Sequence, residues 1–153
     1  MNNELKFRLV TKDDLAEIVR MLSDDNLGAT REKFSEVLSD NYVKAFDIIN
    51  ADPNQELTIV EMNGDKVATF HLTFIQYLTH HGGLRAQIEA VRIHSNYRGQ
   101  GIGKKVFEYV IKRAKQKGCI LLQLTTDKQR PDAIRFYENI GFISTHEGMK
   151  LKL

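Results

Sequence analysis

The chain has 153 residues, of which 42% are hydrophobic and 27% charged, and its formal net charge at pH 7 is +2. That length and composition are typical of one globular domain with a substantial core, and the charge is too small to indicate a polyanionic partner. A single cysteine excludes an internal disulfide framework, and no apolar run approaches the roughly 18 residues of a membrane span. We therefore expect one cytoplasmic domain over residues 1–153, with no membrane attachment.

The first half of the chain predicts a strand, two helices and a hairpin. Residues 5–10 alternate in hydrophobicity like a strand, and Thr11 is typical of the cap of the helix that LAEIVRML forms. A second helix is expected from Glu32 to Leu38, continuing after a break over residues 43–49. ELTIVEM and KVATFHLTFI flank Asn63-Gly64, which predicts a hairpin with a type I′ turn.

The second half predicts alternating strands and helices. RAQIEAVRI, residues 85–93, is the next strand, and a helix with one apolar face follows residues 96–105. CILLQLTT, from Cys119 on, is a nearly unbroken apolar run that predicts a central strand covered on both faces. Pro131 and Gly141 bound another helix, and the tail GFISTHEGMKLKL predicts two short strands. The order β-α-α-β-β-β-α-β-α-β-β indicates a mixed α/β domain.

Residues 96–105, NYRGQGIGKK, place glycines at every second position between a strand and a helix. Glycine permits positive φ and close approach of a ligand, and the free N–H groups at a helix start suit phosphate. Two phosphate-binding motifs do not fit. A Walker A loop needs glycine where Arg98 stands and a hydroxyl where Lys105 stands, and the dinucleotide fingerprint needs glycine at Lys104.

A third pattern fits this loop. The stretch Arg98-Gly-Gln-Gly101-Ile-Gly103, after a strand and opening a helix, resembles the acetyl-coenzyme A loop of the GNAT N-acetyltransferases. AIRFYENIGF, residues 133–142, is similar to the closing segment of that family, in which a helix carries a tyrosine and a Gly-Phe turn follows. The resemblance implies the GNAT fold, a mixed and mostly antiparallel central sheet flanked by helices. It also implies transfer of acetyl from acetyl-CoA, a cosubstrate, to an amine.

By this resemblance, the loop amides and nearby cations hold the cofactor phosphates, and the backbone of the preceding strand holds the pantetheine arm. The expected cofactor-binding residues are Val91, Arg92, Ile93, Arg98, Gly99, Gln100, Gly101, Ile102, Gly103, Lys104 and Arg130. Arg130 stands where many relatives carry an asparagine that contacts the arm, so it is suited instead to a phosphate or an acidic substrate. Ordinary solvated surface charge is the alternative for Arg98 and Lys104.

Two residues are expected to move protons. An amine with a pKa of about 10.4 is mostly protonated at pH 7, so a positioned base helps to expose its lone pair. Glu89 is the expected base, directly or through water, and a structural pair with Arg85 or Arg92 is the alternative. Tyr137 matches the family tyrosine that assists the departing thiolate, and a packing aromatic is the alternative. No nucleophile lies in the motifs, which favours direct transfer in a ternary complex.

The acceptor and the partners are less constrained. Glu89 resembles the glutamate of the amino-sugar enzymes, which favours a small polar amine. A protein amine, or a non-catalytic acetyl-CoA sensor, is the alternative.

His80 and His81 lack neighbouring cysteines or carboxylates, so no metal is expected. His71 is expected to be a residue of the sheet whose hydrogen bonds are satisfied there. The apolar face of the basic helix is needed for the core, so no nucleic acid is expected. Family habit favours a homodimer.

Overall fold

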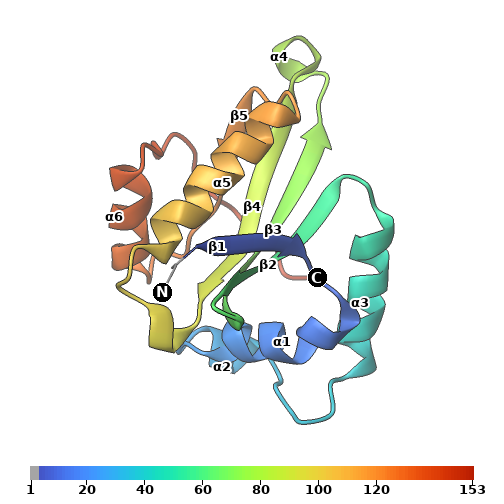
Figure 1. The fold of residues 1–153 in the computed structure, drawn as a ribbon. Helices are drawn as coiled ribbons and strands as arrows, with labels where there is room; N and C mark the ends of the chain where they lie inside the picture. The colour runs from blue at the N-terminus through green and yellow to red at the C-terminus, as the bar shows by residue number, and fades with distance from the viewer. Residues whose placement is uncertain (1–3) are drawn as a thin grey trace. The chain divides into compact units, whose positions relative to one another are not determined.

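The computed structural model describes residues 4–153. The chain forms two compact units, and the boundary between them in the sequence follows Gln123. The first unit contains a five-stranded sheet in the order β1-β2-β3-β4-β5 (Figure 1). Its strands are β1 (Leu5–Leu9), β2 (Gln55–Met62), β3 (Asp65–Gln76), β4 (Leu84–Ile93) and β5 (Leu121–Gln123). Strands β1 to β4 are antiparallel, and β5 is parallel to β4. The mixed α/β class is confirmed, and the single domain over residues 1–153 stays a prediction.

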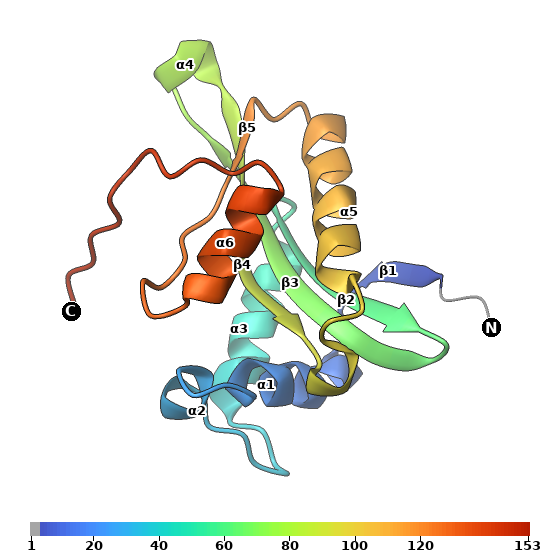
Figure 2. The same cartoon turned by 90° about the vertical axis from the view of Figure 1, so that its left-hand side faces the viewer.

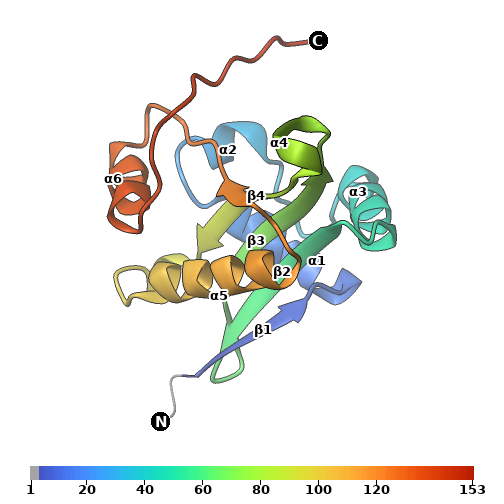
Figure 3. The same cartoon turned by 90° about the horizontal axis from the view of Figure 1, so that it is seen from above.

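Helices cover both faces of this sheet. The helices of this unit are α1 (Leu15–Ser23), α2 (Gly28–Arg31), α3 (Asp40–Ala51), α4 (Thr79–Gly82), which connects β3 to β4, and α5 (Ile102–Gln116), with short 3-10 turns η1 (Lys12–Asp14) and η2 (Ser95–Tyr97). On one face, Tyr109 of α5 packs on Phe70 of β3, with ring centroids 6.1 Å apart. On the other face, Ile59 of β2 packs with Ile18 of α1 and Phe46 of α3. Figures 2 and 3 show α5 and α3 on opposite sides of the central strands.

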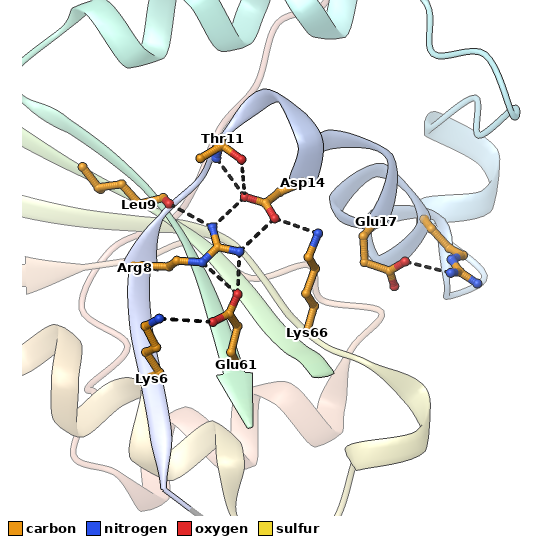
Figure 4. Close-up of polar contacts among 9 residues, drawn as sticks. Lys6, Arg8, Leu9, Thr11, Asp14, Glu17, Glu61 and Lys66 are labelled. Atoms are coloured by element: carbon orange, nitrogen blue, oxygen red, sulfur yellow. Dashed lines mark hydrogen bonds and ion pairs between the residues drawn. The ribbon is translucent and has the colours of Figure 1, made fainter. Parts of the chain in front are cut away.

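Charged side chains around the buried Asp14 tie the segment after β1 to the sheet (Figure 4). The Arg8 guanidinium donates to the Asp14 carboxylate at 2.7 and 3.0 Å and to Glu61 at 2.5 Å. The Lys66 ammonium lies 2.7 Å from Asp14, whose side chain is 2% exposed, and the Thr11 amide donates to Asp14 at 2.8 Å. The bond from Arg8 is the largest cause that holds the pKa of Asp14 far below its usual range.

Strand β4 carries the bulge that shapes the candidate site. His71 pairs with Glu89 and Thr69 with Arg92, so one extra residue of β4 lies between these pairs. Ala90, within that interval, has a φ of 53°. Pairing of β4 with β5 covers only residues 85–87. Beyond them, no described strand pairs with β4 on that side, and an edge of this kind, here over residues 88–93, is one to which an extended chain can add.

Two expectations about the first unit are wrong, and one is confirmed. No helix forms over residues 32–38, because Glu32 is extended and the next helix starts after Ser39, whose hydroxyl accepts the Asn41 amide at 3.3 Å. Strand β5 is an edge strand of the described sheet and not a central one. The turn at Asn63-Gly64 has positive φ at both residues, 52° and 91°, as a type I′ turn requires.

The second unit, residues 124–153, contains α6 (Pro131–Asn139). Pro131 begins this helix and Gly141, with a φ of 100°, follows its end, as expected. The two short strands expected over residues 141–153 are absent from this part of the described chain, which forms no ladder there. Ile143 and Met149, apolar residues of the tail, are exposed. Within residues 4–153, no helix combines the length and hydrophobicity needed to cross a bilayer.

Candidate active site

The glycine loop leads from η2 into α5. Gly99 and Gly101 have φ angles of 75° and 76°, a conformation that side chains disfavour, and a Cβ atom at either would meet nothing within 4 Å. The first backbone bond of the helix runs from the Lys105 amide to the Gly101 carbonyl, at 3.4 Å. The amides of residues 102–104 precede that bond, and such amides at a helix start point outward with a partial positive charge. The loop thus combines open space with unused donors, which suits an anion.

The side chains of the expected loop residues fall into two groups. Lys104 is exposed, whereas Ile102 is buried in the core below α5 and can act only through its backbone. The Gln100 amide donates to the Asn96 carbonyl at 3.2 Å, so it holds the loop together. Gly103 is half-buried in the first turn of α5.

Arg98 and Arg92 both reach the acidic segment that follows α1. Arg98 donates through Nε to the Ile93 carbonyl at 3.1 Å and through its terminal nitrogen to the Asp24 carboxylate at 3.2 Å. Arg92 lies 3.7 Å from the Asp25 carboxylate and donates to the Val91 carbonyl at 2.9 Å. Two predicted cofactor contacts are therefore also ties to the segment between α1 and α2, Arg92 from the end of β4 and Arg98 from the loop after η2, a link that the sequence does not reveal.

Glu89 is exposed on β4 and oriented by a chain of amides. The Gln123 side chain donates to the Gln87 oxygen at 2.8 Å, and the Gln87 nitrogen donates to the Glu89 carboxylate at 2.9 Å. Neither arginine that was considered as an alternative partner of Glu89 pairs with it. Arg92 lies on Asp25, and Arg85 stacks over the Tyr77 ring at 4.5 Å. Glu89 is thus held in place without a neutralising arginine from its own strand.

His71 is the residue that sequence reasoning misjudged. It lies on β3 directly opposite Glu89, and its Nε2 atom is buried without a hydrogen-bond partner among the described residues. Burial lowers the pKa of this imidazole, and the negative charge of Glu89 partly offsets that effect. The alternation of TFHLTF gave no signal of this, because pairing with Glu89 depends on the sheet register.

The remaining candidates have structural surroundings of their own. Tyr137 lies in α6, where its ring packs edge-on against Phe136 and Phe142 at 5.6 and 5.9 Å between centroids. Arg130 caps the same helix. Both belong to the second unit, so their roles at the reacting atoms stay predictions. Burial raises the pKa of the Cys119 thiol, which disfavours a nucleophilic role.

His80 and His81 both adopt left-handed backbone conformations in α4, with φ angles of 53° and 57°. In the part of the chain that the structure describes, no three His, Cys, Asp or Glu residues gather as they would around a metal ion.

Known proteins resemble this chain over most of its length. An aminoalkylphosphonate N-acetyltransferase of Salmonella typhimurium is 32% identical over 95 residues, which cover 62% of this chain and 61% of that protein. A transcriptional regulator from Bacillus halodurans C-125 is 48% identical and superposes with a TM-score of 0.94, over 98% of this chain and 100% of that one. A predicted acetyltransferase with acetyl-CoA from Clostridium acetobutylicum shares the fold, at 21% identity and a TM-score of 0.73, over 97% and 96% of the chains.

The curated relatives are longer than the matched part, since this chain spans at most 61% of their length. The family comparison is more extensive. Residues 16–142 match the model of the Acetyltransferase (GNAT) family, and that range includes the glycine loop, the bulged strand and the helix with the tyrosine. The chain belongs to the GNAT acetyltransferase family.

Proposed function

We propose that the protein transfers an acetyl group from acetyl-CoA directly to the primary amine of a small polar acceptor. One observation carries this proposal: the loop of residues 98–104 presents helix-start amides over open space, next to the unpaired edge of β4. The amides suit the cofactor phosphates, and the strand edge suits the amide groups of a pantetheine arm. Membership of the family and the named relatives support the same cofactor and reaction.

In this proposal, Glu89 accepts the proton that the acceptor amine must lose. Exposing the lone pair of an amine with a pKa of about 10.4 costs roughly 4–5 kcal/mol at pH 7, and a carboxylate held beside the nitrogen reduces that barrier. The Gln87 amide fixes one carboxylate oxygen and leaves the other for the substrate or a bridging water. The lone pair then forms the C–N bond while the C–S bond breaks, and Tyr137 protonates the departing sulfur.

The acceptor class rests on the relatives and on the charges near β4. The Salmonella typhimurium protein is named for aminoalkylphosphonates, small amines that also carry an anionic group. Arg92 and Arg98 line the acidic segment after α1, and Lys104 is exposed at the loop. A small amine is favoured over a protein terminus on these grounds. The cytoplasmic setting and the homodimer stay predictions.

The test is release of free thiol from acetyl-CoA across a panel of aminophosphonates, amino sugars, polyamines and peptide N-termini. We expect turnover with one amine class, loss of most turnover in Glu89→Gln, and an unchanged acetyl-CoA Kd in that variant by calorimetry. Glu108→Gln, at an exposed position of α5, is the matched control and keeps full activity. Absence of acetyl-CoA binding in the wild type would refute the proposal.

A second function is favoured by one specific similarity. The transcriptional regulator from Bacillus halodurans C-125 resembles this chain along nearly its whole length. A non-catalytic acetyl-CoA sensor would keep the loop and the strand edge, since these bind the cofactor without chemistry. Tight acetyl-CoA binding with no turnover on any amine or peptide would favour the sensor over the enzyme.

A further inference from the structure

His71 and Glu89 form a cross-strand pair at the candidate site. They lie opposite each other in the antiparallel register of β3 and β4, so their side chains leave the same face of the sheet. Residues in such positions have Cβ atoms about 4.5–5.5 Å apart, within reach of both side chains. The His71 Nε2 atom is buried, whereas Glu89 is exposed. The imidazole therefore lies on the protein side of a carboxylate that faces solvent.

The Glu89 carboxylate is already oriented from its other side. Gln123 donates to the Gln87 oxygen at 2.8 Å, which directs the Gln87 nitrogen to one Glu89 oxygen at 2.9 Å. That Glu89 oxygen accepts a hydrogen bond, and the second Glu89 oxygen can accept one from another donor. On the residue opposite Glu89, the His71 Nε2 atom is buried without a partner among the described residues, which is unusual because buried polar atoms normally find partners.

No other charged group in the surrounding strands competes for His71. On β2, the residue opposite His71 is the apolar Leu57. The charged neighbours are engaged elsewhere: Glu56 with Arg113 of α5, Arg92 with Asp25, and Arg85 over the Tyr77 ring. Helix α1 and the residues after it add Asp25 to this face, and its negative charge is opposed by Arg92. Glu89 is therefore the charge that governs the imidazole.

We propose that His71 is a positioning residue that completes a two-member proton acceptor with Glu89, an inference that rests on the proposed acetyl transfer. Two protons leave the nitrogen as the ammonium becomes an amide. One passes to Glu89 and on to the His71 Nε2 atom, and the other ends on the departing sulfur. The nitrogen lone pair forms the C–N bond, and the C–S bond breaks with its electron pair on sulfur. The resulting imidazolium faces the carboxylate, which stabilises it.

The pair is a better base than the carboxylate alone. An ordinary glutamate has a pKa of about 4.3 and an ordinary histidine about 6.5, a difference of about 100-fold in proton affinity, and the burial that lowers the pKa of His71 makes this the upper limit of the gain. Base efficiency rises as the pKa of the base approaches the working pH. We therefore expect His71→Gln to lower kcat by about 10- to 100-fold, with KM unchanged within about twofold.

The pH profile separates this role from a structural one. In His71→Gln no imidazole is present to take up the proton, so the acidic limb of the kcat profile moves to lower pH. Thr73→Val, two residues along the same face of β3, is the matched control. This variant keeps the wild-type kcat and the wild-type position of the acidic limb. An unchanged limb and kcat in His71→Gln would overturn the proposal, and so would an equal loss in Thr73→Val.

A second measurement needs no acceptor. Titration of the His71 imidazole by NMR, assigned by its loss in His71→Gln, should show a lower midpoint in Glu89→Gln than in the wild type, because the carboxylate stabilises the imidazolium. The exposed His146 serves as the internal control. An unchanged His71 midpoint would overturn the pair whether or not the enzyme turns over. A wild type inactive on every amine, with this coupling present, would instead refute only the proposed function.

Discussion

Two glycines at opposite ends of α5 allow the role of the loop to be separated from backbone strain. Gly101 precedes the helix and Gly118 follows it, with φ angles of 76° and 78°, and a Cβ atom at either meets nothing within 4 Å. Alanine at each position costs about 1–2 kcal/mol, because an L-residue disfavours this conformation. Since each kcal/mol lowers Tm by roughly 2–4 °C in a chain of this size, both variants should lose about 2–8 °C.

Cofactor binding should distinguish these two variants. In Gly101→Ala the methyl group occupies the open space before the α5 amides, so phosphate oxygens can no longer reach their donors. We expect the acetyl-CoA Kd to rise at least about tenfold, equal to about 1.4 kcal/mol, whereas Gly118→Ala binds within about twofold of the wild type. Calorimetric titration and thermal unfolding measure the two effects. Equal Kd values in the two variants would refute the assignment of the loop to phosphate.

Further outcomes are expected for stability, cofactor binding and turnover. Asp14→Asn should lower the free energy of unfolding, measured with urea, by about 1.5–3 kcal/mol, the range of a hydrogen bond to a charged group, because Arg8 and Lys66 lose the Asp14 carboxylate while Arg8 keeps Glu61. Because the pKa of Asp14 is lowered in the folded state, this group stabilises the fold at pH values above its ordinary pKa of 3.8, and the stabilisation is lost progressively as the pH falls below 3.8. A wild type that is equally stable at pH 3 and pH 6 would contradict this. Asp24→Asn should release Arg98 and tighten acetyl-CoA binding by up to about fivefold, the range of an exposed ion pair, whereas Arg98→Ala should weaken that binding. If calorimetry shows no change of Kd in either variant, a phosphate role for Arg98 is contradicted. Tyr137→Phe should lower kcat by about 10²- to 10⁴-fold at unchanged acetyl-CoA Kd, and an unchanged kcat would leave Tyr137 a packing residue.

Signals that act within a few residues could be read from the sequence. Asn63-Gly64 predicted a turn because two adjacent residues must adopt positive φ there, and the structure has 52° and 91°. Pro131 and Gly141 predicted the bounds of α6 for similar local reasons. The glycine loop belongs to this class too, since its conformation is fixed by the residues that carry it.

Signals that depend on distant partners could not be read in this way. Residues 32–38 have acceptable helical spacing, yet Tyr42 of α3 donates its hydroxyl to the Glu32 carboxylate at 2.8 Å and holds that residue in an extended segment. The apolar run after Cys119 predicted a central strand, but only residues 121–123 pair, along one side of β4. The C-terminal tail alternates like a strand, and alternation alone supplies no neighbour for its backbone.

The bulge at Ala90 decides the electrostatics of the candidate site. In a regular strand, residues three apart point to opposite faces, so the sequence places Glu89 and Arg92 on different sides of the sheet. The structure inserts one extra residue between them, and both then pair with residues of β3 that share a face, His71 and Thr69. Arg92 thereby reaches Asp25, and Glu89 faces His71 on the same side of the sheet. One residue with a left-handed backbone thus brings the proposed base and the paired arginine to one surface, and no periodicity in the sequence marks it.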